Sequence, residues 1–471
     1  MKKSIKLSII IIPCALILSF FAFTGLRFAK ITMAESATTL SQEENTALKN
    51  QLKSIYSDKY SNLKSLPYNL SKTELDIQAK AAILIDTSNG CILYEKNADE
   101  IIPPASMTKL FSMYVVFEDV MSGKLAFDQE IDLPPEAWAC NAPPHSSLMF
   151  LGKGHHVTVD ELLKGTSISS GNDAAYALAY ATSGSMDNFI DRMNSLADKF
   201  GLNETHFVEA SGYSELNSTT ARQMADFARR YINFYPDAIE KYHSIQSFTY
   251  PKKENMADGD IYKAQDWSAG LPEHITMGIT QQNTNPLLGK LDGVDGLKTG
   301  YIDESGYNLA LTARRMGTRF LSVTMGGPGN NAREGNAGRV HDGKELMEWA
   351  FSTFKDYTNM TAVKSYFVRT SGAKTISVNL IPAYIPESLT VPFIYGNSVE
   401  ESVENVRVVL NLPKKIDISA NPGDILGKIS FTLGDTVLES IPLVCDREIK
   451  KAGPLTRLAD TIVWAIIGMK D

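Results

Sequence analysis

Ser106 and Lys109 lie three residues apart, just before an apolar stretch, LFSMYVVF, that predicts a buried helix. Residues three apart on a helix lie side by side, so the lysine amine can reach the serine hydroxyl. A serine hydroxyl is a poor nucleophile until a nearby base takes its proton. Lysine can be that base if burial and a neighbouring positive charge lower its pKa. The alternative is that Lys109 is an ordinary residue on a helix surface.

The spacing S-x-x-K is weak evidence by itself, because it also begins at Ser61, Ser352 and Ser371. Two later motifs distinguish Ser106 from these matches. Ser170-Gly171-Asn172 has the form S-x-N, and residues 298–300 read K-T-G. K-T-G occurs once in the sequence, whereas S-x-N recurs. The ordered trio therefore predicts a serine acyl-transfer site.

The elements around these motifs predict an α/β (α+β) domain over residues 76–358. KAAILIDTSNGCILYEKNADE, from residue 80, predicts two strands joined by the Asn89-Gly90 turn. Helical periodicity dominates residues 105–233 and includes the segment 161–184. Strand patterns return at 294–326, and a helix at 343–354 follows. Strands at both ends of a helical middle indicate one sheet built from both ends.

The remaining segments predict a different organisation. Residues 362–448 hold short β-branched runs between turn residues, which predicts a small all-β domain, and residues 35–75 predict a polar helical spacer. Residues 1–34 have the basic start and apolar middle of an export signal cut after Ala34; the alternative is an uncleaved anchor. Residues 452–471 predict an amphipathic helix on a membrane surface, with Asp460 on its polar face. The alternative is that this helix packs on the protein's own last domain.

Charge and cysteine usage narrow the possible functions. The net charge is −8 and the pI about 5.5, so we expect no nucleic-acid partner. We expect Cys91, Cys140 and Cys445 to be small buried residues, with a Cys91–Cys140 disulfide as the alternative. The neighbouring histidines 155 and 156 point apart in any regular element, so they are not expected to share a metal ion. No metal or organic cofactor is expected.

The chain resembles the D-alanyl-D-alanine carboxypeptidases, the low-molecular-mass penicillin-binding proteins. The resemblance rests on the three motifs and on the segments around them, among them PPASMTKLFSMYVVFE, VTVDELLKGTSISSGNDAAYALA and GVDGLKTGYIDESGYNLALTA. It covers roughly residues 76–448 and includes the β-rich domain. It implies an exported enzyme on the outer face of the bacterial cell membrane, which removes the terminal D-alanine of peptidoglycan stem pentapeptides and is acylated by β-lactams.

The resemblance also assigns roles to the first two motifs. Ser106 would attack the carbonyl between the two terminal D-alanines, and Lys109 would take its proton. Ser170 would relay a proton to the leaving amine. Asn172 would bind the peptide's amide carbonyl and Lys109.

The third motif is expected to hold the substrate. Lys298 would stabilise developing charge and help to keep the base neutral, Thr299 would bind the terminal carboxylate, and Gly300 belongs to the same strand. The oxyanion hole would consist of the backbone N–H of the nucleophile and that of Tyr301. Arg339 matches an arginine that assists carboxylate recognition, with a surface arginine as the alternative reading and Arg333 as the rival.

Departures from the family pattern leave some questions open. Many relatives have histidine where Tyr301 stands, which bears on substrate fit more than on chemistry. Residues 251–276 resemble an insertion, expected as a loop near the cleft. A β-lactamase would need a water-activating glutamate where Tyr213 stands, so rapid β-lactam hydrolysis is not expected. Transpeptidase or endopeptidase action remains the nearer alternative, and a non-catalytic wall-binding protein is the more distant one.

Overall fold

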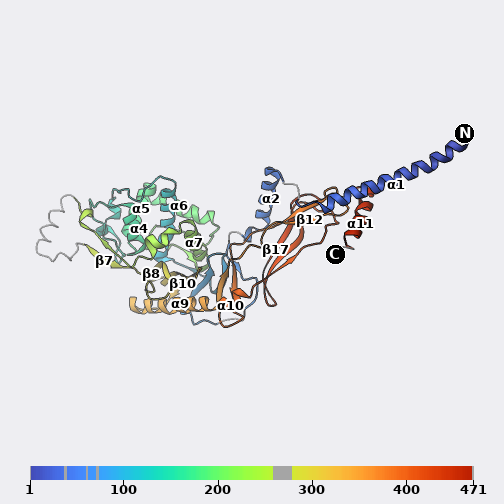
Figure 1. Cartoon of the computed structure of the whole chain (residues 1–471). Helices are drawn as coiled ribbons and strands as arrows, with labels where there is room; N and C mark the ends of the chain where they lie inside the picture. The colour runs from blue at the N-terminus through green and yellow to red at the C-terminus, as the bar shows by residue number, and fades with distance from the viewer. Residues whose placement is uncertain (1, 37–39, 60–61, 71–73, 258–277, 469–471) are drawn as a thin grey trace. The chain divides into compact units, whose positions relative to one another are not determined.

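The chain forms two compact units, which the computed structural model describes over residues 2–36, 40–59, 62–70, 74–257 and 278–468 (Figure 1). One unit consists of residues 63–356. The other combines residues 1–62 with residues 357–471, so both ends of the chain belong to it. The three sequence motifs all lie in the 63–356 unit.

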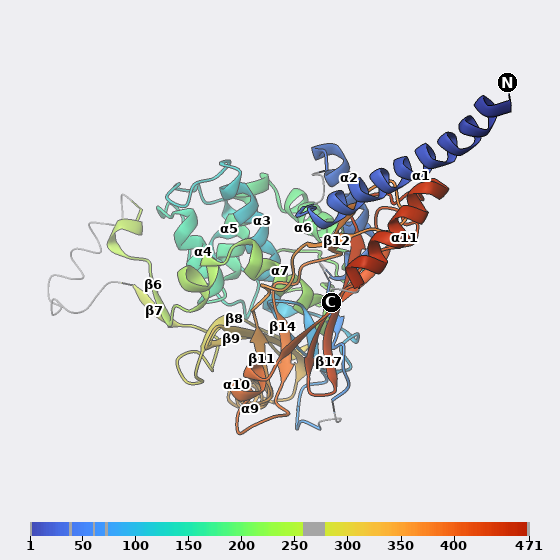
Figure 2. The same cartoon turned by 45° about the vertical axis from the view of Figure 1, so that its right-hand side comes forward.

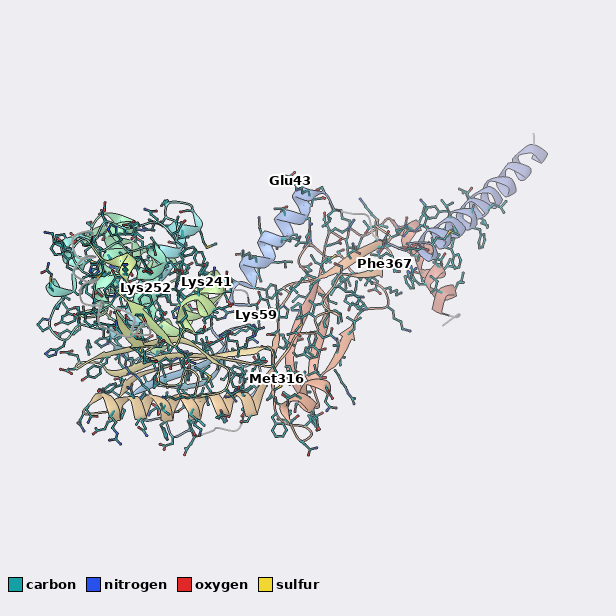
Figure 3. All side chains as sticks on the ribbon, turned by 60° about the vertical axis from the view of Figure 1, so that its left-hand side comes forward. Glu43, Lys59, Lys241, Lys252, Met316 and Phe367 are labelled. Atoms are coloured by element: carbon teal, nitrogen blue, oxygen red, sulfur yellow. The ribbon has the colours of Figure 1, made fainter. Side chains whose placement is uncertain are left out.

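A mixed sheet forms the centre of the 63–356 unit, in the strand order β1-β3-β2-β10-β9-β8. Its strands are β1 (Lys64–Ser65), β2 (Ala81–Asp86), β3 (Cys91–Lys96), β8 (Val294–Ile302), β9 (Gly306–Arg315) and β10 (Thr318–Gly327). β1 runs parallel to β3, and the other neighbours are antiparallel. The predicted turn joins β2 to β3, and Gly90 has a φ of +76°, which glycine adopts without steric cost. Met316, labelled in Figure 3, lies in the turn between β9 and β10.

Helices cover both faces of this sheet, because successive side chains of a strand point to opposite faces. Ala81, Ile83 and Ile85 of β2 pack in a core with α3 (Lys109–Met121), α4 (Val159–Ser167), α5 (Asn172–Ser183), α6 (Met186–Lys199) and α7 (Ala221–Phe234). Ala82 and Leu84 pack in a second core with α9 (Ala332–Thr353). Figure 1 shows α9 on the sheet face opposite α4, α5 and α6. The predicted α/β class is confirmed.

Shorter elements complete this unit. Two small antiparallel pairs are formed by β4 (Ile101–Ile102) with β5 (Thr219–Thr220) and by β6 (Ser247–Tyr250) with β7 (Ile279–Gln282). The short helical turns are η2 (Ala105–Thr108), η3 (Pro135–Ala137), η4 (Ala139–Asn141), η5 (Ile239–His243) and η6 (Lys253–Asn255). β11 (Phe354–Tyr357) carries the chain from this unit into the next.

The second unit contains a sheet in the order β12-β13-β17-β16-β15. Its elements are β12 (Tyr366–Arg369), β13 (Ser377–Pro382), β14 (Leu389–Pro392), α10 (Val399–Glu404), β15 (Arg407–Asn411), β16 (Ile425–Leu433) and β17 (Thr436–Cys445). Before it in the chain come α2 (Gln42–Ile55) and η1 (Ser57–Lys59). Lys59 Nζ lies 3.5 Å from Glu439 Oε1 on β17, so the segment after α2 contacts this sheet (Figure 3).

The two terminal helices of this unit, α1 (Lys2–Thr32) and α11 (Pro454–Gly468), lie side by side (Figures 1 and 2). Among the helices that the structure describes, none combines the length and the apolar character needed to cross a membrane.

Three expectations differ from the observed structure, and a fourth is not tested by it. The helical segment 161–184 is broken between α4 and α5, where Ser170 has a φ of +59° that a helix cannot contain. Cys140 is exposed, whereas Cys91 and Cys445 are buried, and these three described cysteines are free thiols. Asp460 is fully buried, not on a solvated polar face. Of the insertion at 251–276, residues 258–276 lie outside the described part of the chain.

Candidate active site

Ser106 lies in the short turn η2, which leads directly into the buried helix α3. Ala105, just before it, has a φ of +49°, an uncommon value for a residue with a side chain. The following turn of helix brings Lys109 beneath the serine, and Lys109 Nζ lies 3.0 Å from Ser106 Oγ. The predicted pairing of these two side chains is therefore present in the fold.

Lys109 is completely buried, with an exposed fraction of 0%. Its Nζ lies 2.8 Å from Asn172 Oδ1 and 2.7 Å from the carbonyl oxygen of Ser211. A charged ammonium would donate to both acceptors and to the serine oxygen. A neutral amine has two N–H groups, which these two acceptors satisfy, so its lone pair would face the hydroxyl of Ser106. The geometry fits a lysine that receives the serine proton, and the surface reading of Lys109 is wrong.

Burial lowers the pKa of Lys109 to about 7, because a cation without water is costly, although Glu209 and Asp173 oppose this shift. Lys298 is also buried, and burial, the charge of Lys109 and the charge of Arg339 all lower its pKa. We call Lys109 and Lys298 the lysine pair. Two close buried cations repel each other, so the pair loses its first proton far more readily than a solvated lysine does.

The S-x-N motif occupies the break between α4 and α5, where Asn172 is the first residue of α5. Its side-chain oxygen accepts from Lys109, while its backbone N–H donates to the carbonyl of Ser147 at 2.8 Å. Ser170 Oγ accepts a hydrogen bond of 2.9 Å from Lys298 Nζ. Each serine of the site thus lies within hydrogen-bonding distance of one member of the lysine pair.

The K-T-G motif lies in β8, which packs against the turn that carries Ser106. Lys298 and Thr299 are buried, and Thr299 Oγ1 donates to Thr284 Oγ1 at 2.7 Å. A Cβ on Gly300 would lie 2.6 Å from the carbonyl oxygen of Pro104 and 3.1 Å from the backbone nitrogen of Ser106. Glycine is required here because the strand backbone must approach the serine turn this closely.

A second glycine contacts the same turn from another segment. A Cβ on Gly212 would lie 1.8 Å from the carbonyl oxygen of Ala105 and 2.8 Å from the nitrogen of Ser106, and its φ is +83°. Both the steric contact and the left-handed backbone exclude other residues. The turn that carries Ser106 is therefore enclosed by backbone on two sides.

Arg339 is buried, with an exposed fraction of 8%, so the alternative that it is a surface arginine is wrong. Its guanidinium donates to the carbonyl oxygens of Gly300 and Asn308, on β8 and β9. It also lies over the ring of Tyr307, 4.9 Å from the ring centre, and Tyr307 stacks on Tyr301. The rival arginine, at position 333, is exposed. Arg339 thus contacts the backbone of the K-T-G strand.

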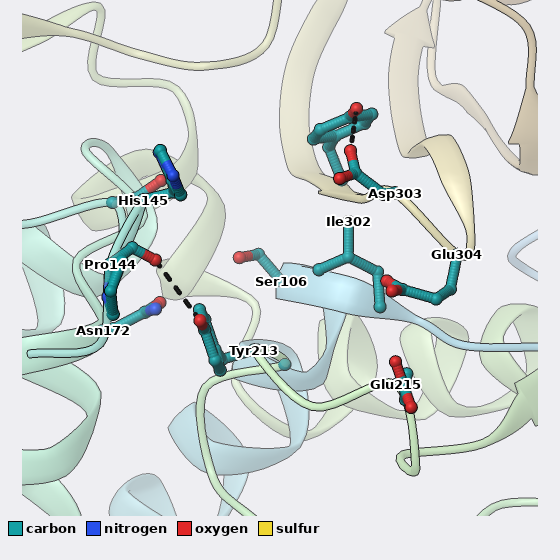
Figure 4. Close-up of a pocket in the computed structure, with 12 residues that line it drawn as sticks. Ser106, Pro144, His145, Asn172, Tyr213, Glu215, Ile302, Asp303 and Glu304 are labelled. Carbon is teal, nitrogen blue, oxygen red and sulfur yellow. Dashed lines mark hydrogen bonds between the residues drawn. The ribbon is translucent and has the colours of Figure 1, made fainter.

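A cavity of about 530 Å³ opens above Ser106. Its lining comes from three segments: residues 144–147, residues 212–215 and residues 301–304, together with Ser106 and Asn172. Figure 4 shows Ser106 between His145 and Tyr213 on one side and Ile302, Asp303 and Glu304 on the other. Tyr213 donates from its hydroxyl to the carbonyl of Pro144 at 3.3 Å. A volume of this size lies in the range of cavities that bind small molecules and short peptides.

Two carboxylates that sequence reasoning missed hold the loops of the site. Asp173 accepts hydrogen bonds of 2.8–3.0 Å from the backbone N–H groups of residues 149, 150, 151 and 174. Glu209 accepts from the backbone N–H groups of Ser211 and Gly212, at 2.7 and 2.6 Å. Their side chains therefore fix the loops that carry Ser147 and Ser211. Asp173 directly follows the S-x-N motif, which was a usable signal; nothing in the sequence marks Glu209.

Known proteins are similar to this chain over most of its length. Residues 68–329 match the family described as D-alanyl-D-alanine carboxypeptidase, and residues 370–451 match the C-terminal domain of penicillin-binding protein 5. A D-alanyl-D-alanine carboxypeptidase of Escherichia coli, DacC, is 30% identical over 84% of this chain and 88% of its own length. Another, DacF of Bacillus subtilis, is 29% identical over 83% of this chain and 90% of its own length.

Solved structures agree with these matches. Penicillin-binding protein 5 from Haemophilus influenzae has a TM-score of 0.64 and 28% sequence identity, covering 81% of this chain and all of its own. The carboxypeptidase DacD from Francisella tularensis has a TM-score of 0.63 and 26% identity, covering 83% of this chain and 97% of its own. The matched family is one of serine hydrolases, and a serine beside a buried lysine fits that class. The chain belongs to the D-alanyl-D-alanine carboxypeptidase family, and the predicted family and enzyme class are confirmed.

Proposed function

We propose that Ser106 is the nucleophile and Lys109 the general base with which this serine carboxypeptidase removes the terminal D-alanine from peptidoglycan stem pentapeptides. The observation that carries the proposal is the environment of Lys109: complete burial, a pKa lowered to about 7, and a position 3.0 Å from Ser106 Oγ. Two acceptors take the N–H groups of the neutral amine, so the lone pair is directed at the serine. A base with a pKa near the working pH transfers protons most effectively.

In the acylation step, Lys109 takes the hydroxyl proton while Ser106 Oγ bonds to the carbonyl carbon of the penultimate D-alanine. The negative charge that develops on the carbonyl oxygen is stabilised by the backbone N–H groups of Ser106 and Tyr301. The C–N bond then breaks. Ser170 gives its hydroxyl proton to the leaving amine nitrogen and is reprotonated from the lysine pair, to which it is hydrogen-bonded through Lys298. D-alanine leaves and an ester remains at Ser106.

In the deacylation step, the neutral lysine takes a proton from water, and the resulting hydroxide attacks the ester carbonyl. The ester C–O bond breaks, Ser106 regains a proton, and the shortened peptide is released. Asn172 supports both steps, since its side chain binds Lys109 and can donate to the peptide's amide carbonyl.

Recognition of the terminal carboxylate is assigned to Lys298, Thr299 and Gly300. A cation and a hydroxyl in a dry site bind a carboxylate far more strongly than they would in water. Arg339 contributes through the strand itself, because it donates to the carbonyl oxygen of Gly300. This contact supports a positioning role for Arg339 and favours it over the exposed arginine at position 333 as the residue that assists carboxylate recognition.

β-Lactams are expected to acylate Ser106 in the same way and to leave slowly. Tyr213 stands where a class A β-lactamase would need its water-activating glutamate, and its hydroxyl donates to the carbonyl of Pro144. A phenol hydroxyl that donates a hydrogen bond in this way cannot replace a carboxylate as the base for water. The peptidyl ester at Ser106 can pass its peptide to an amine instead of water, so transpeptidation remains the alternative activity.

We also propose that the protein acts outside the cytoplasm and contacts the membrane surface through α11. Leu455, Leu458 and Ile466 of this helix are exposed, which is costly in water and favourable in the interfacial region of a bilayer. Replacing the three by serine should weaken flotation of the protein with anionic lipid vesicles. Undiminished flotation would oppose a role for α11.

The catalytic proposal is tested by D-alanine release from a stem pentapeptide. Wild-type protein should release D-alanine, and Ser106→Ala and Lys109→Ala should abolish release, with thermal unfolding used to verify that each variant is folded at the assay temperature. Ser352→Ala, which changes an exposed serine in another S-x-x-K match, is the matched control and should behave as wild type. Adding an amine acceptor such as a D-amino acid reports transpeptidation. Release that persists in Ser106→Ala would refute the assignment.

A further inference from the structure

His243 is a completely buried histidine on η5 that takes no part in the steps proposed above. Its Nδ1 lies 2.9 Å from the carbonyl oxygen of Leu297 and 3.0 Å from Ser167 Oγ. Its Nε2 lies 2.7 Å from the hydroxyl oxygen of Tyr231. Since these three partners belong to β8, α4 and α7, one imidazole ring connects three elements of the 63–356 unit.

The position of the ring proton follows from these partners. The carbonyl oxygen of Leu297 can only accept a hydrogen bond, so Nδ1 must carry the proton. The same N–H is shared with Ser167 Oγ, and the hydroxyl of that serine donates to the carbonyl oxygen of Tyr242 at 3.2 Å. Nε2 is then unprotonated and accepts a hydrogen bond from Tyr231. A single tautomer therefore satisfies both nitrogens of the buried ring.

The two segments that share this N–H are those that carry Ser170 and Lys298. Leu297 directly precedes Lys298 on β8, and Ser167 ends α4 three residues before Ser170. Lys298 Nζ donates to Ser170 Oγ at 2.9 Å. Hydrogen bonds weaken steeply when they are stretched or misaligned, so a small shift of the end of α4 relative to β8 would break this contact.

The ring is also neutral, although it lies beside the lysine pair. Burial lowers the pKa of His243 to about 3, the charge of Lys298 adds to this shift, and the hydrogen bond to Leu297 opposes it. His243 therefore holds the two segments together without adding a third cation to the site.

We propose that His243 is a positioning residue: by holding the end of α4 against β8, its Nδ1–H keeps Ser170 in contact with Lys298, so that a proton can be given to the leaving amine. The inference rests on the relay proposed for Ser170. An amide nitrogen must be protonated as the C–N bond breaks, because an amide anion is a very poor leaving group. Loss of the contact should therefore slow the release of an amine more than the release of a group that needs no proton.

The test compares two substrates with different leaving groups. One is the stem peptide that ends in D-Ala-D-Ala, whose leaving amine needs a proton. In the other, the penultimate D-alanine is joined through a thioester to mercaptoacetate, which keeps the terminal carboxylate and leaves as a thiolate without a proton. The measured quantity is the ratio of kcat/KM for the amide to kcat/KM for the thioester. A change in the fraction of folded enzyme alters both values equally, so loss of stability alone cannot change this ratio.

Two substitutions of His243 separate the roles of its ring nitrogens. The amide nitrogen of asparagine is bonded to Cγ, as Nδ1 of histidine is, so His243→Asn keeps a donor toward Leu297. Glutamine places its amide nearer the position of Nε2, so His243→Gln leaves that carbonyl without its donor. Ser167→Ala removes the α4 partner of the ring. Ser402→Ala is the matched control, because Ser402 is a buried serine of the other unit that also donates to a backbone carbonyl.

The inference predicts that His243→Gln lowers the amide-to-thioester ratio by about tenfold or more, and that Ser167→Ala lowers it less. His243→Asn and Ser402→Ala should leave the ratio within about twofold of wild type. An unchanged ratio in His243→Gln would overturn the inference, and so would an equal fall in both His243 variants, because the Nδ1–H would then not be responsible.

Ser170→Ala, measured in parallel, distinguishes a failure of this inference from a failure of the proposed relay. If Ser170→Ala lowers the ratio and His243→Gln does not, the relay stands and the positioning role of His243 is wrong. If Ser170→Ala lowers the amide and thioester rates equally, Ser170 does not protonate the leaving amine, and both the relay and the inference are overturned.

Discussion

The pH dependence of acylation tests the assignment of Lys109 most directly. Only the neutral amine can take the proton of Ser106, so the rate of acylation should follow the neutral fraction of Lys109. With a pKa of about 7, this fraction is about 9% at pH 6 and about 91% at pH 8, a tenfold change. The sign follows from the charge: a lysine base is activated as the pH rises through its pKa.

The assay is the rate of covalent labelling of Ser106 by a fluorescent penicillin, measured from pH 5 to pH 9 at constant ionic strength. Labelling should rise about tenfold between pH 6 and pH 8 and then level off. Lys109→Ala should label about 10²- to 10⁴-fold more slowly, with a flat profile, because the general base is absent. The control is Lys96→Met, which removes a lysine of the same unit that donates to backbone carbonyls away from the cavity.

The labelling experiment can refute the reasoning in two ways. A wild-type profile that stays flat from pH 6 to pH 8 would mean that Lys109 does not change its protonation state there. A Lys109→Ala variant that keeps the wild-type rate would mean that another group takes the serine proton. If Lys96→Met lowered the rate as much as Lys109→Ala, the effect would be one of stability and not of catalysis.

Further predictions concern the residues that shape the active site and the effect of Lys109 on stability. Gly300→Ala should slow acylation at least tenfold, because its Cβ would lie 3.1 Å from the nitrogen of Ser106; an unchanged rate in the labelling assay would argue against the enclosed serine turn. Asp173→Asn should lower the free energy of unfolding by about 1–3 kcal/mol in denaturant titrations, since one amide oxygen cannot accept all four backbone N–H groups. Tyr301→Ala should leave kcat within about threefold while KM rises, because the oxyanion is bound by backbone; a collapse of kcat would assign the side chain to the chemistry. The unfolding free energy of wild type should rise with pH above about 7 relative to Lys109→Met, since the unfolded state then binds the proton that the folded lysine has released; a parallel pH dependence would contradict the lowered pKa.

The residues that we propose carry the chemistry could be selected from the sequence because their spacing is local. Ser106 and Lys109 share one helical turn, and Asn89-Gly90 marks a hairpin without any tertiary context. The α/β class followed from the order of strand and helix patterns. Periodicity could not predict the break before Asn172, because the segment on each side is a good helix former and Ser170 adopts its φ of +59° only in its tertiary surroundings.

The sequence by itself determined which groups are present: a serine, two lysines, an asparagine and a strand glycine in a fixed order, on elements whose type their periodicity specifies. Only the tertiary structure decided their protonation states and how closely these groups lie to one another. The pKa of Lys109 depends on burial by segments more than 60 residues away, and Asp460 becomes a buried partner of Arg27 across 433 residues. Desolvation and pairing are properties of the space around a group, and that space is assembled from distant parts of the chain.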